Sequence, residues 1–223
     1  MNIKNIALTI VDGLGTETEQ YQNIAKNILT NLNYFISEVL FLTPSKEYNN
    51  NEFNVKYIDI LNYCDLNELL FQKLINYSDS EYFMVVQTDG FPINYNLWDD
   101  DFLNYDYIGA PWPSGMRWTG NSPVVGNGGF SIRSRKLYDM TNKISGFREF
   151  HKQSLTNEDV TISVVVRKML EENGIKFAPV ELAKKFSVEI PISEDHKLEN
   201  CFGFHGKRYI EILKDKKHEL FCN

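Results

Sequence analysis

The stretch Tyr82-Phe83-Met84-Val85-Val86-Gln87-Thr88-Asp89-Gly90 decides the fold prediction. An apolar run of this length is typical of a buried strand, and Gly90 marks the turn that follows it. Ligands of open α/β sheets bind outside the carboxyl ends of the strands. Asp89 stands at such an end, where a carboxylate can hold a divalent cation that carries a phosphate. The alternative is an Asp that only ends the strand and caps the next turn.

Strands and helices alternate in the chain before this strand. Strands are predicted over 6–11, 39–42 and 55–60, and apolar residues at helical spacing predict helices over 21–32 and 66–75. Such alternation indicates a parallel, Rossmann-like sheet. Residues 91–130 are instead rich in Pro, Gly, Asn and aromatic residues, which predicts loops and short strands. We therefore predict one α/β domain over 1–223, with a mostly parallel central sheet, a nucleotide-binding half (1–90) and a loop-rich acceptor half (91–223).

Bulk composition excludes some classes of partner. The 223 residues carry a net charge of -7 and no basic block, so a nucleic-acid partner is not expected. Cys64, Cys201 and Cys222 have neither zinc-ligand nor redox spacing, which indicates ordinary thiols in a reducing compartment. No segment approaches the roughly 20 apolar residues of a transmembrane helix. We predict a cytoplasmic protein without a transmembrane segment and leave peripheral membrane contact open.

Two motifs in the second half are candidates for chemistry. Gly126-Asn127-Gly128-Gly129 has three glycines in four positions, which allow close backbone approach to a ligand; a tight turn between strands is the alternative. Glu158 and Asp159 are adjacent acids that could include a general base. Their alternative explanation is stabilisation by the dipole at the start of a helix, predicted to run to Glu172.

A histidine and an aromatic cluster complete the candidates. His205 lies between Phe204 and Gly206 in a predicted loop, where an imidazole is a good ligand for Mn²⁺. Lys207 or Arg208, just beyond Gly206, could neutralise a leaving diphosphate. Tyr107 and Trp112 belong to a group of aromatic residues that could stack against sugars, or form a core under long loops.

Six motifs in a fixed order resemble one family. They are QTDG at 87–90, YDYIGAPWP at 105–113, GNGGFSIRS at 126–134, NED at 157–159, FSVE at 186–189 and FGFHG at 202–206. The chain is similar, over residues 5 to 210, to an uncharacterised family of predicted glycosyltransferases found in microbes. The resemblance implies a GT-A fold, a single Rossmann-like domain that binds a nucleoside-diphosphate sugar.

The resemblance also implies roles for particular residues. GT-A enzymes hold Mn²⁺ or Mg²⁺ with an Asp-x-Asp motif, and here Asp89 matches the second acid while Gln87 replaces the first. His205 is similar to the C-terminal metal ligand of several GT-A families. Asp159 is similar to the base of inverting galactosyltransferases. Because an amide supplies no charge, Gln87 departs from the pattern and puts the metal requirement in question.

The expected reaction is transfer of a sugar from a nucleoside diphosphate, with a UDP-sugar favoured, to a hydroxyl of a glycan or other acceptor. Inversion is favoured, and retention stays open, because retaining GT-A enzymes also use an acid near this position. Asp89 and His205 would hold the cation, Asp159 would act as base, and Glu158 would orient the donor. Tyr107 and Trp112 would line the acceptor site. The residues expected to contact the nucleotide sugar are Thr9, Val11, Asp12, Gln87, Thr88, Gly128, Gly129 and Lys207.

Two other functions remain open from the sequence. A nucleotidyltransferase shares the sheet and the metal chemistry, but it usually has a basic loop after the first strand, and Asp12-Gly13-Leu14-Gly15-Thr16 contains no basic residue. A non-catalytic nucleotide- or glycan-binding module would keep the fold and lose the chemistry, and Gln87 favours it.

Overall fold

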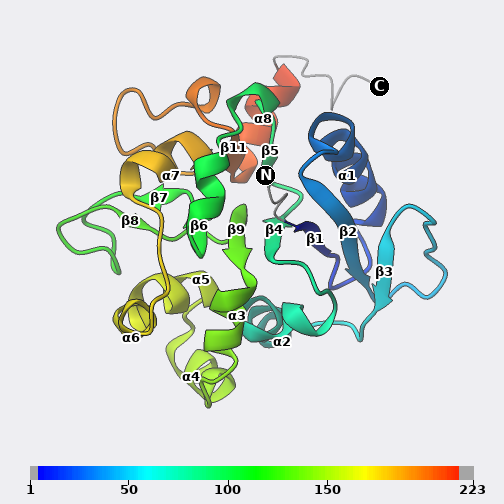
Figure 1. The fold of residues 1–223 in the computed structure, drawn as a ribbon, viewed down its shortest axis with the longest axis horizontal. Helices are drawn as coiled ribbons and strands as arrows, with labels where there is room; N and C mark the ends of the chain where they lie inside the picture. Colours follow the sequence, from blue (N-terminus) through cyan, green and yellow to red (C-terminus); the bar gives the residue numbers. More distant parts are fainter. Residues whose placement is uncertain (1–4, 216–223) are drawn as a thin grey trace.

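The central element of the protein is a six-stranded sheet with the strand order β3-β2-β1-β4-β9-β6 (Figure 1). The computed structural model describes residues 5–215. Strands β3, β2, β1 and β4 run parallel, and β9 is antiparallel to both β4 and β6. The α/β prediction is therefore confirmed, with the antiparallel strands supplied by the second half of the chain. The strands are β1 (Ile6–Val11), β2 (Ile36–Thr43), β3 (Asn54–Tyr57), β4 (Tyr82–Val86), β6 (Tyr107–Gly109) and β9 (Ser131–Ser134).

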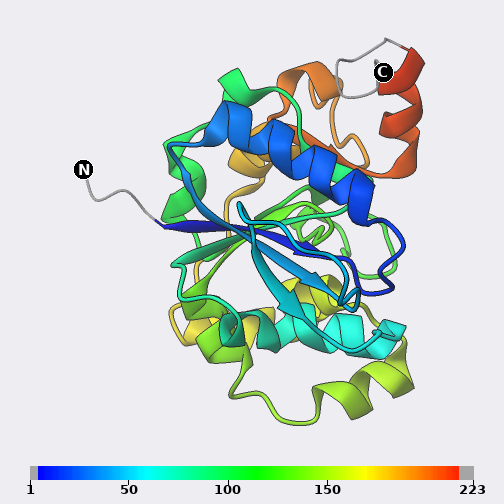
Figure 2. The same cartoon turned by 90° about the vertical axis from the view of Figure 1, so that its right-hand side faces the viewer.

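Helices cover both faces of this sheet. Helix α1 (Thr18–Leu32) lies on one face, whereas α2 (Tyr63–Glu68) lies on the other (Figure 2). Alternate residues of β1 point to opposite faces. Ile6, Leu8 and Ile10 join the core that includes α1, whereas Ala7 packs in a second apolar cluster on the other face. Burial of both faces explains why the strands consist of continuous apolar runs. Helix α2 continues as a π-helical turn, η1 (Leu69–Lys73), and then a 3₁₀ turn, η2 (Leu74–Asn76).

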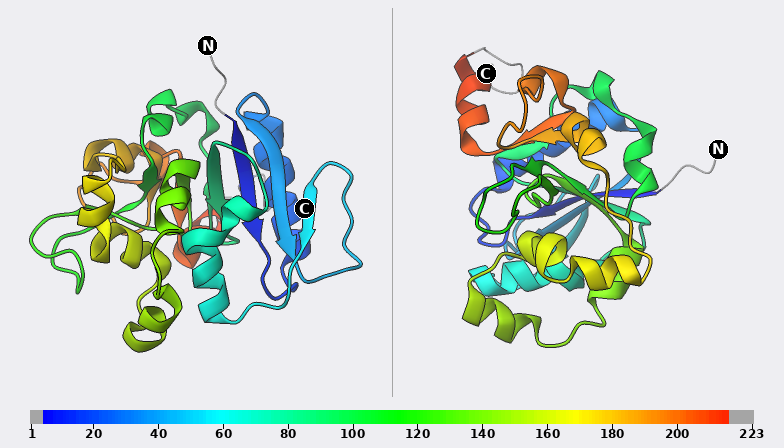
Figure 3. Two further views of the ribbon diagram at one scale, coloured as in Figure 1. Left: turned by 60° about the horizontal axis from the view of Figure 1, so that its bottom comes forward. Right: turned by 90° about the vertical axis from the view of Figure 1, so that its left-hand side faces the viewer.

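The second half adds short strands around one end of the sheet, as predicted for residues 91–130. β5 (Gly90–Pro92) pairs with β11 (Gly203–His205), which pairs with β10 (Ser187–Val188). β7 (Pro111–Trp112) pairs with β8 (Val124–Val125), and their connecting loop lies at the side of the molecule opposite β3 (Figure 3). Two 3₁₀ turns, η3 (Tyr95–Leu97) and η4 (Asp100–Asn104), precede β6.

The helices of the second half are short. The helix predicted to end at Glu172 is divided into α5 (Glu158–Val160), a π-helical turn η5 (Thr161–Val165) and α6 (Arg167–Glu172). A 3₁₀ turn, η6 (Leu198–Asn200), precedes β11. Within residues 5–215, no helix has the length and apolar content to cross a bilayer. The remaining helices are α3 (Arg135–Thr141), α4 (Phe147–Ser154), α7 (Val180–Phe186) and α8 (Lys207–Asp215).

Candidate active site

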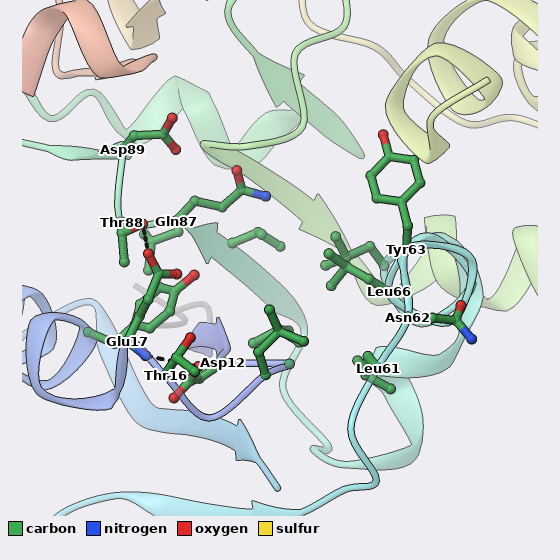
Figure 4. Close-up of a pocket in the computed structure, with 17 residues that line it drawn as sticks. Asp12, Thr16, Glu17, Leu61, Asn62, Tyr63, Leu66, Gln87, Thr88 and Asp89 are labelled. Atoms are coloured by element: carbon green, nitrogen blue, oxygen red, sulfur yellow. Dashed lines mark hydrogen bonds between the residues drawn. The ribbon is translucent and has the colours of Figure 1, made fainter. Parts of the chain in front are cut away.

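A pocket of about 470 Å³ opens at the carboxyl ends of β1 and β4. Its walls come entirely from residues 11–89. Figure 4 shows Leu61, Asn62 and Tyr63 on one side of the opening and Glu17 and Thr88 on the other. Of the residues predicted to contact the nucleotide sugar, Val11, Asp12, Gln87 and Thr88 line this pocket, and so does Asp89.

The charged side chains that line this pocket in the described part of the chain are all acidic. Its described lining residues include the carboxylates of Asp12, Glu17 and Asp89 and no Lys or Arg. Asp12 is buried, and its carboxylate accepts hydrogen bonds from the Thr18 hydroxyl over 2.5 Å and the Glu17 N–H over 3.4 Å. Asp12 therefore tethers the start of α1, where an anion is favoured by the helix dipole.

Thr9 does not reach the pocket, so its prediction as a nucleotide contact is corrected. It is fully buried inside β1, and its hydroxyl donates to the Ala7 carbonyl over 3.1 Å. The prediction placed it at the end of the strand, but Val11 and Asp12 occupy that end.

A second, smaller pocket of about 190 Å³ adjoins the first, since Tyr63, Leu66, Leu70 and Gln87 line both. It brings together predicted site residues that are far apart in the sequence. Besides the shared residues, its lining comprises Asn67, Gly129, Asn157, Glu158, Asp159 and His205.

Asp89 and His205 meet at the boundary between the pockets, as the metal-site prediction requires. His205 pairs with Gly90 across β11 and β5, and this register places its imidazole beside Asp89. The Nε2 atom lies 3.6 Å from the Asp89 Oδ1 and 3.3 Å from the Gln87 Oε1. Burial alone would lower the pKa of His205, but the hydrogen bond to Glu189 and the charges of Glu189 and Asp89 outweigh it, so the pKa is raised.

Glu189 is a site residue to which the sequence assigned no role. Its Oε1 lies 3.3 Å from His205 Nδ1, and its Oε2 accepts the Trp112 indole N–H over 2.9 Å. The FSVE motif was a visible signal. Its partner, His205, is identified by the parallel pairing of β10 with β11. Val188 lies opposite Phe204, so the residues that follow them, Glu189 and His205, come together.

Glu158 is buried in an ion pair with Arg133. Arg133 is fully buried and lies 3.0 Å from Glu158 Oε1, and it also donates to the carbonyls of Gly128 and Leu70 over 3.2 and 2.8 Å. Leu70 belongs to the π-helical turn η1, and π turns are frequent at functional sites. Sequence reasoning missed Arg133, because an arginine in a strand carries no mark of such burial.

Asp159 lies at the start of α5. One carboxylate oxygen accepts the Gly128 N–H over 3.0 Å, and the other accepts the Val160 N–H over 2.7 Å. Burial, followed by repulsion from Glu158, raises the pKa of Asp159 to about 7. A carboxyl group with a pKa near neutrality is suited to exchange protons with a substrate.

Gly128 and Gly129 are needed for close packing. A Cβ at Gly128 would lie 2.6 Å from Arg133 Nη2, and a Cβ at Gly129 would lie 2.2 Å from His205 Nε2. Neither glycine is among those with positive φ. Gly129 lines the second pocket, so its backbone faces the space expected for the sugar, whereas Gly128 is not among the lining residues.

The two residues predicted to line the acceptor site are buried, which corrects that prediction. Tyr107 has no exposed surface, and its hydroxyl donates to the Gly126 carbonyl over 2.6 Å. Trp112 is 3% exposed and is held by Glu189. Both are buried under the loops, which is the alternative that the sequence left open for these aromatic residues. Lys207 is exposed at the start of α8 and lines neither pocket.

Comparison with known proteins identifies the family. A family model described as "Protein of unknown function (DUF5672)" matches residues 46–205. The chain belongs to this family. The matched region contains Asp89, Gln87, Asp159 and His205 and begins after β1, α1 and β2.

The fold is also that of a solved protein. A crystal structure of a glycosyltransferase involved in the glycosylation of the major capsid of PBCV-1 superimposes with a TM-score of 0.52. The match has 10% sequence identity and covers 97% of this chain and 98% of the other. The protein therefore has a Rossmann-like glycosyltransferase fold. No curated protein sequence matches the chain.

Proposed function

We propose that this protein is a glycosyltransferase that moves a sugar from a nucleoside diphosphate to a hydroxyl, with inversion at the anomeric carbon. One observation carries the proposal. A pocket of nucleotide size adjoins a smaller pocket lined by Asp159, and Asp89 and His205 stand between the two. The fold shared with a solved glycosyltransferase supports the same reaction class.

The nucleotide would occupy the larger pocket. Leu61 and Tyr63 offer an apolar wall for the base, and the diphosphate would lie toward Asp89 at the junction with the smaller pocket. A UDP-sugar is the first donor to test. The sugar would then enter the smaller pocket, beside Gly129 and Asp159.

Asp159 would act as the general base. As the acceptor oxygen forms its bond to the anomeric carbon, the bond from that carbon to the diphosphate oxygen breaks, and Asp159 takes the acceptor proton. Glu158 has its charge satisfied by Arg133 and lines the same pocket. We assign it to holding Arg133 and the Gly128 turn, and to orienting donor hydroxyls with the rest of its carboxylate.

The donor set at the junction fits Mn²⁺ or Mg²⁺. Asp89, His205 and Gln87 direct a carboxylate oxygen, an imidazole nitrogen and an amide oxygen toward one another, and imidazole with oxygen ligands suits Mn²⁺. Across residues 5–215, no group of three or more His, Cys, Asp and Glu side chains is arranged to hold a metal. Diphosphate and water oxygens would therefore complete the coordination, as is usual for Mg²⁺ with phosphates. A bound cation would neutralise the diphosphate, which the acidic pocket does not do itself.

The acceptor would lie in a groove of about 420 Å³ that shares Asn157 with the smaller pocket. Trp118 supplies an aromatic wall, and Arg117 is the one charged residue among the described lining residues. Because Asn157 precedes Glu158 and Asp159, a glycan in this groove would end beside the proposed base. This groove replaces Tyr107 and Trp112 as the proposed acceptor contact.

The test is a thermal-shift screen followed by turnover. UDP, GDP, TDP and their sugars are added with and without Mn²⁺, and a ligand at a hundred times its Kd should add about 2.7 kcal/mol of stability. We expect a Mn²⁺-dependent shift with one base and slow release of nucleoside diphosphate from its sugar. Binding without turnover on any acceptor would favour the non-catalytic module. Pyrophosphate release from a nucleoside triphosphate would favour a nucleotidyltransferase. No shift with any donor would contradict the proposal.

A further inference from the structure

Glu189 is the point where three donors converge beside the proposed cation site. The Trp112 indole N–H donates to its Oε2 over 2.9 Å, and His205 Nδ1 lies 3.3 Å from its Oε1. The Asn127 amide donates to the same carboxylate. The Trp112 indole N–H and the Asn127 amide nitrogen can only donate, so the Glu189 carboxylate is the acceptor in both bonds.

The orientation of Asn127 is fixed by its backbone neighbourhood. Its Oδ1 accepts the Gly129 N–H over 3.1 Å, so the Nδ2 amide is the end that faces His205 and Glu189. Nδ2 lies 2.9 Å from His205 Nδ1. The amide and the carboxylate therefore compete for this ring nitrogen. The amide, which donates, favours an unprotonated Nδ1, and the carboxylate, which accepts, favours a protonated Nδ1.

The position of the ring proton determines whether the other nitrogen, Nε2, can bind a cation. Nε2 faces the Asp89 carboxylate and the Gln87 Oε1, at 3.6 and 3.3 Å. If Nε2 carried the proton, it would donate to these oxygens and could not bind a cation. If Nδ1 carries the proton, Nε2, Asp89 and Gln87 present three lone pairs to one space. A hydrogen bond to a charged acceptor is the stronger of the two choices at Nδ1.

We propose that Glu189 is a positioning residue that holds the proton of His205 on Nδ1 and so turns the Nε2 lone pair toward Asp89 and Gln87. The inference rests on the proposed function for the identity of the cation. A carboxylate that orients a ligand histidine raises its basicity and fixes its tautomer. Glu189 would also link the ligand to Asn127, and through it to Gly129, which lines the proposed sugar pocket.

The first experiment measures the tautomer in the metal-free protein. Two-bond ¹H–¹⁵N correlation spectra of labelled protein at pH 8 distinguish the Nδ1–H, Nε2–H and doubly protonated forms, and a His205→Gln variant assigns the signals. We expect the Nδ1–H form in the wild type and a shift toward Nε2–H in Glu189→Gln. A wild-type His205 that is protonated on Nε2, or on both nitrogens, would overturn the proposal.

The second experiment titrates Mn²⁺ into the protein, with and without UDP, and follows free Mn²⁺ by electron paramagnetic resonance. Loss of such a partner typically weakens metal binding by about 10- to 100-fold, which we expect for Glu189→Gln. Glu194→Gln is the matched control, since Glu194 is exposed in the same segment. Trp112→Phe removes the indole hydrogen bond to Glu189 and leaves the contact with His205, so this variant should bind Mn²⁺ like the wild type.

The two arms separate the possible failures. If Trp112→Phe and Glu189→Gln lose Mn²⁺ binding equally, Glu189 acts only by packing, and the proposal is wrong. If the wild type binds no Mn²⁺ with or without UDP, the cation in the proposed function is wrong, and the spectra still decide the role of Glu189. Should Glu189→Gln fail to fold, the wild-type spectrum and Trp112→Phe remain decisive.

Discussion

The Gly128 N–H donates to the carboxylate of Asp159 over 3.0 Å and joins the glycine-rich turn to the start of α5. Arg133 reinforces this link, because it contacts both the Gly128 carbonyl and Glu158. The proposed base is thus held by residues from two segments of the second half, opposite the strand ends that form the nucleotide pocket. Five predictions follow from this arrangement and from the groove beside it.

Asp159→Asn should strongly slow transfer while leaving donor binding intact, because the amide cannot accept the acceptor proton. General-base catalysis contributes about 10²- to 10⁴-fold, so kcat should fall by that factor. The measurement is kcat for transfer together with the donor Kd. Asp139→Asn, on the exposed side of α3, is the matched control. Full activity in Asp159→Asn would remove Asp159 from the mechanism.

Transfer should depend on pH through the ionisation of Asp159. Its pKa is raised to about 7, and only the ionised form can accept a proton. The rate should therefore rise as the pH increases through about 7 and level off above it. Profiles of kcat/KM against pH report this group in the free enzyme. A profile that stays flat from pH 5 to 9 would contradict the assignment.

The same ionisation should lower the stability of the fold. The pKa of Asp159 is raised in the folded protein above the value near 3.9 of an unfolded chain. Between these values the folded state binds a proton that the unfolded state has released, so stability decreases as the pH rises toward 7. Asp159→Asn should therefore have a higher Tm than the wild type at pH 8, with a smaller difference at pH 5. Thermal unfolding at both pH values checks this, and a Tm below the wild type at pH 8 would contradict it.

Arg133→Met should strongly destabilise the protein, since Glu158 would remain buried without its partner. Breaking a buried ion pair in this way costs about 3–5 kcal/mol. Combining Arg133→Met with Glu158→Met removes both charges and should cost less than the sum of the two single changes. Urea unfolding of the three variants gives the coupling energy. Strict additivity would show that the pair does not act as a unit.

Trp118→Ala should raise the KM for the acceptor and leave that for the donor unchanged. Trp118 lines the groove that shares Asn157 with the sugar pocket, and it does not line the nucleotide pocket. Loss of aromatic stacking on a ligand costs about 0.5–1.5 kcal/mol, or roughly 2- to 10-fold in KM. Tyr34→Ala is the control, because Tyr34 is 84% exposed and precedes β2, at the end of the strands away from the pocket. An equal rise in both KM values would place the acceptor elsewhere.

Several features of the site could be predicted because they depend on short segments. Asp89 follows a buried strand, and strand ends carry the ligand side of a parallel sheet. His205 was recognisable by the glycines at 203 and 206 around it, but it lies in strand β11 and not in the predicted loop. Arg133 and Glu189 were not recognisable, because each acquires its role from a partner distant in the sequence. Tyr107 and Trp112 were placed in the site from residue type and Thr9 from its place near the end of a strand, and burial decided against all three.

The amino-acid sequence by itself determined the alternation of strands and helices in residues 5–90 and the place of Asp89, because hydrophobic periodicity and turn residues act locally. Tertiary structure alone decided which polar groups meet. The antiparallel register of β5 and β11 brings His205 to Asp89, and the parallel pairing of β10 with β11 brings Glu189 to His205. These contacts join residues separated by many positions, so only strand pairing and core packing fix their geometry.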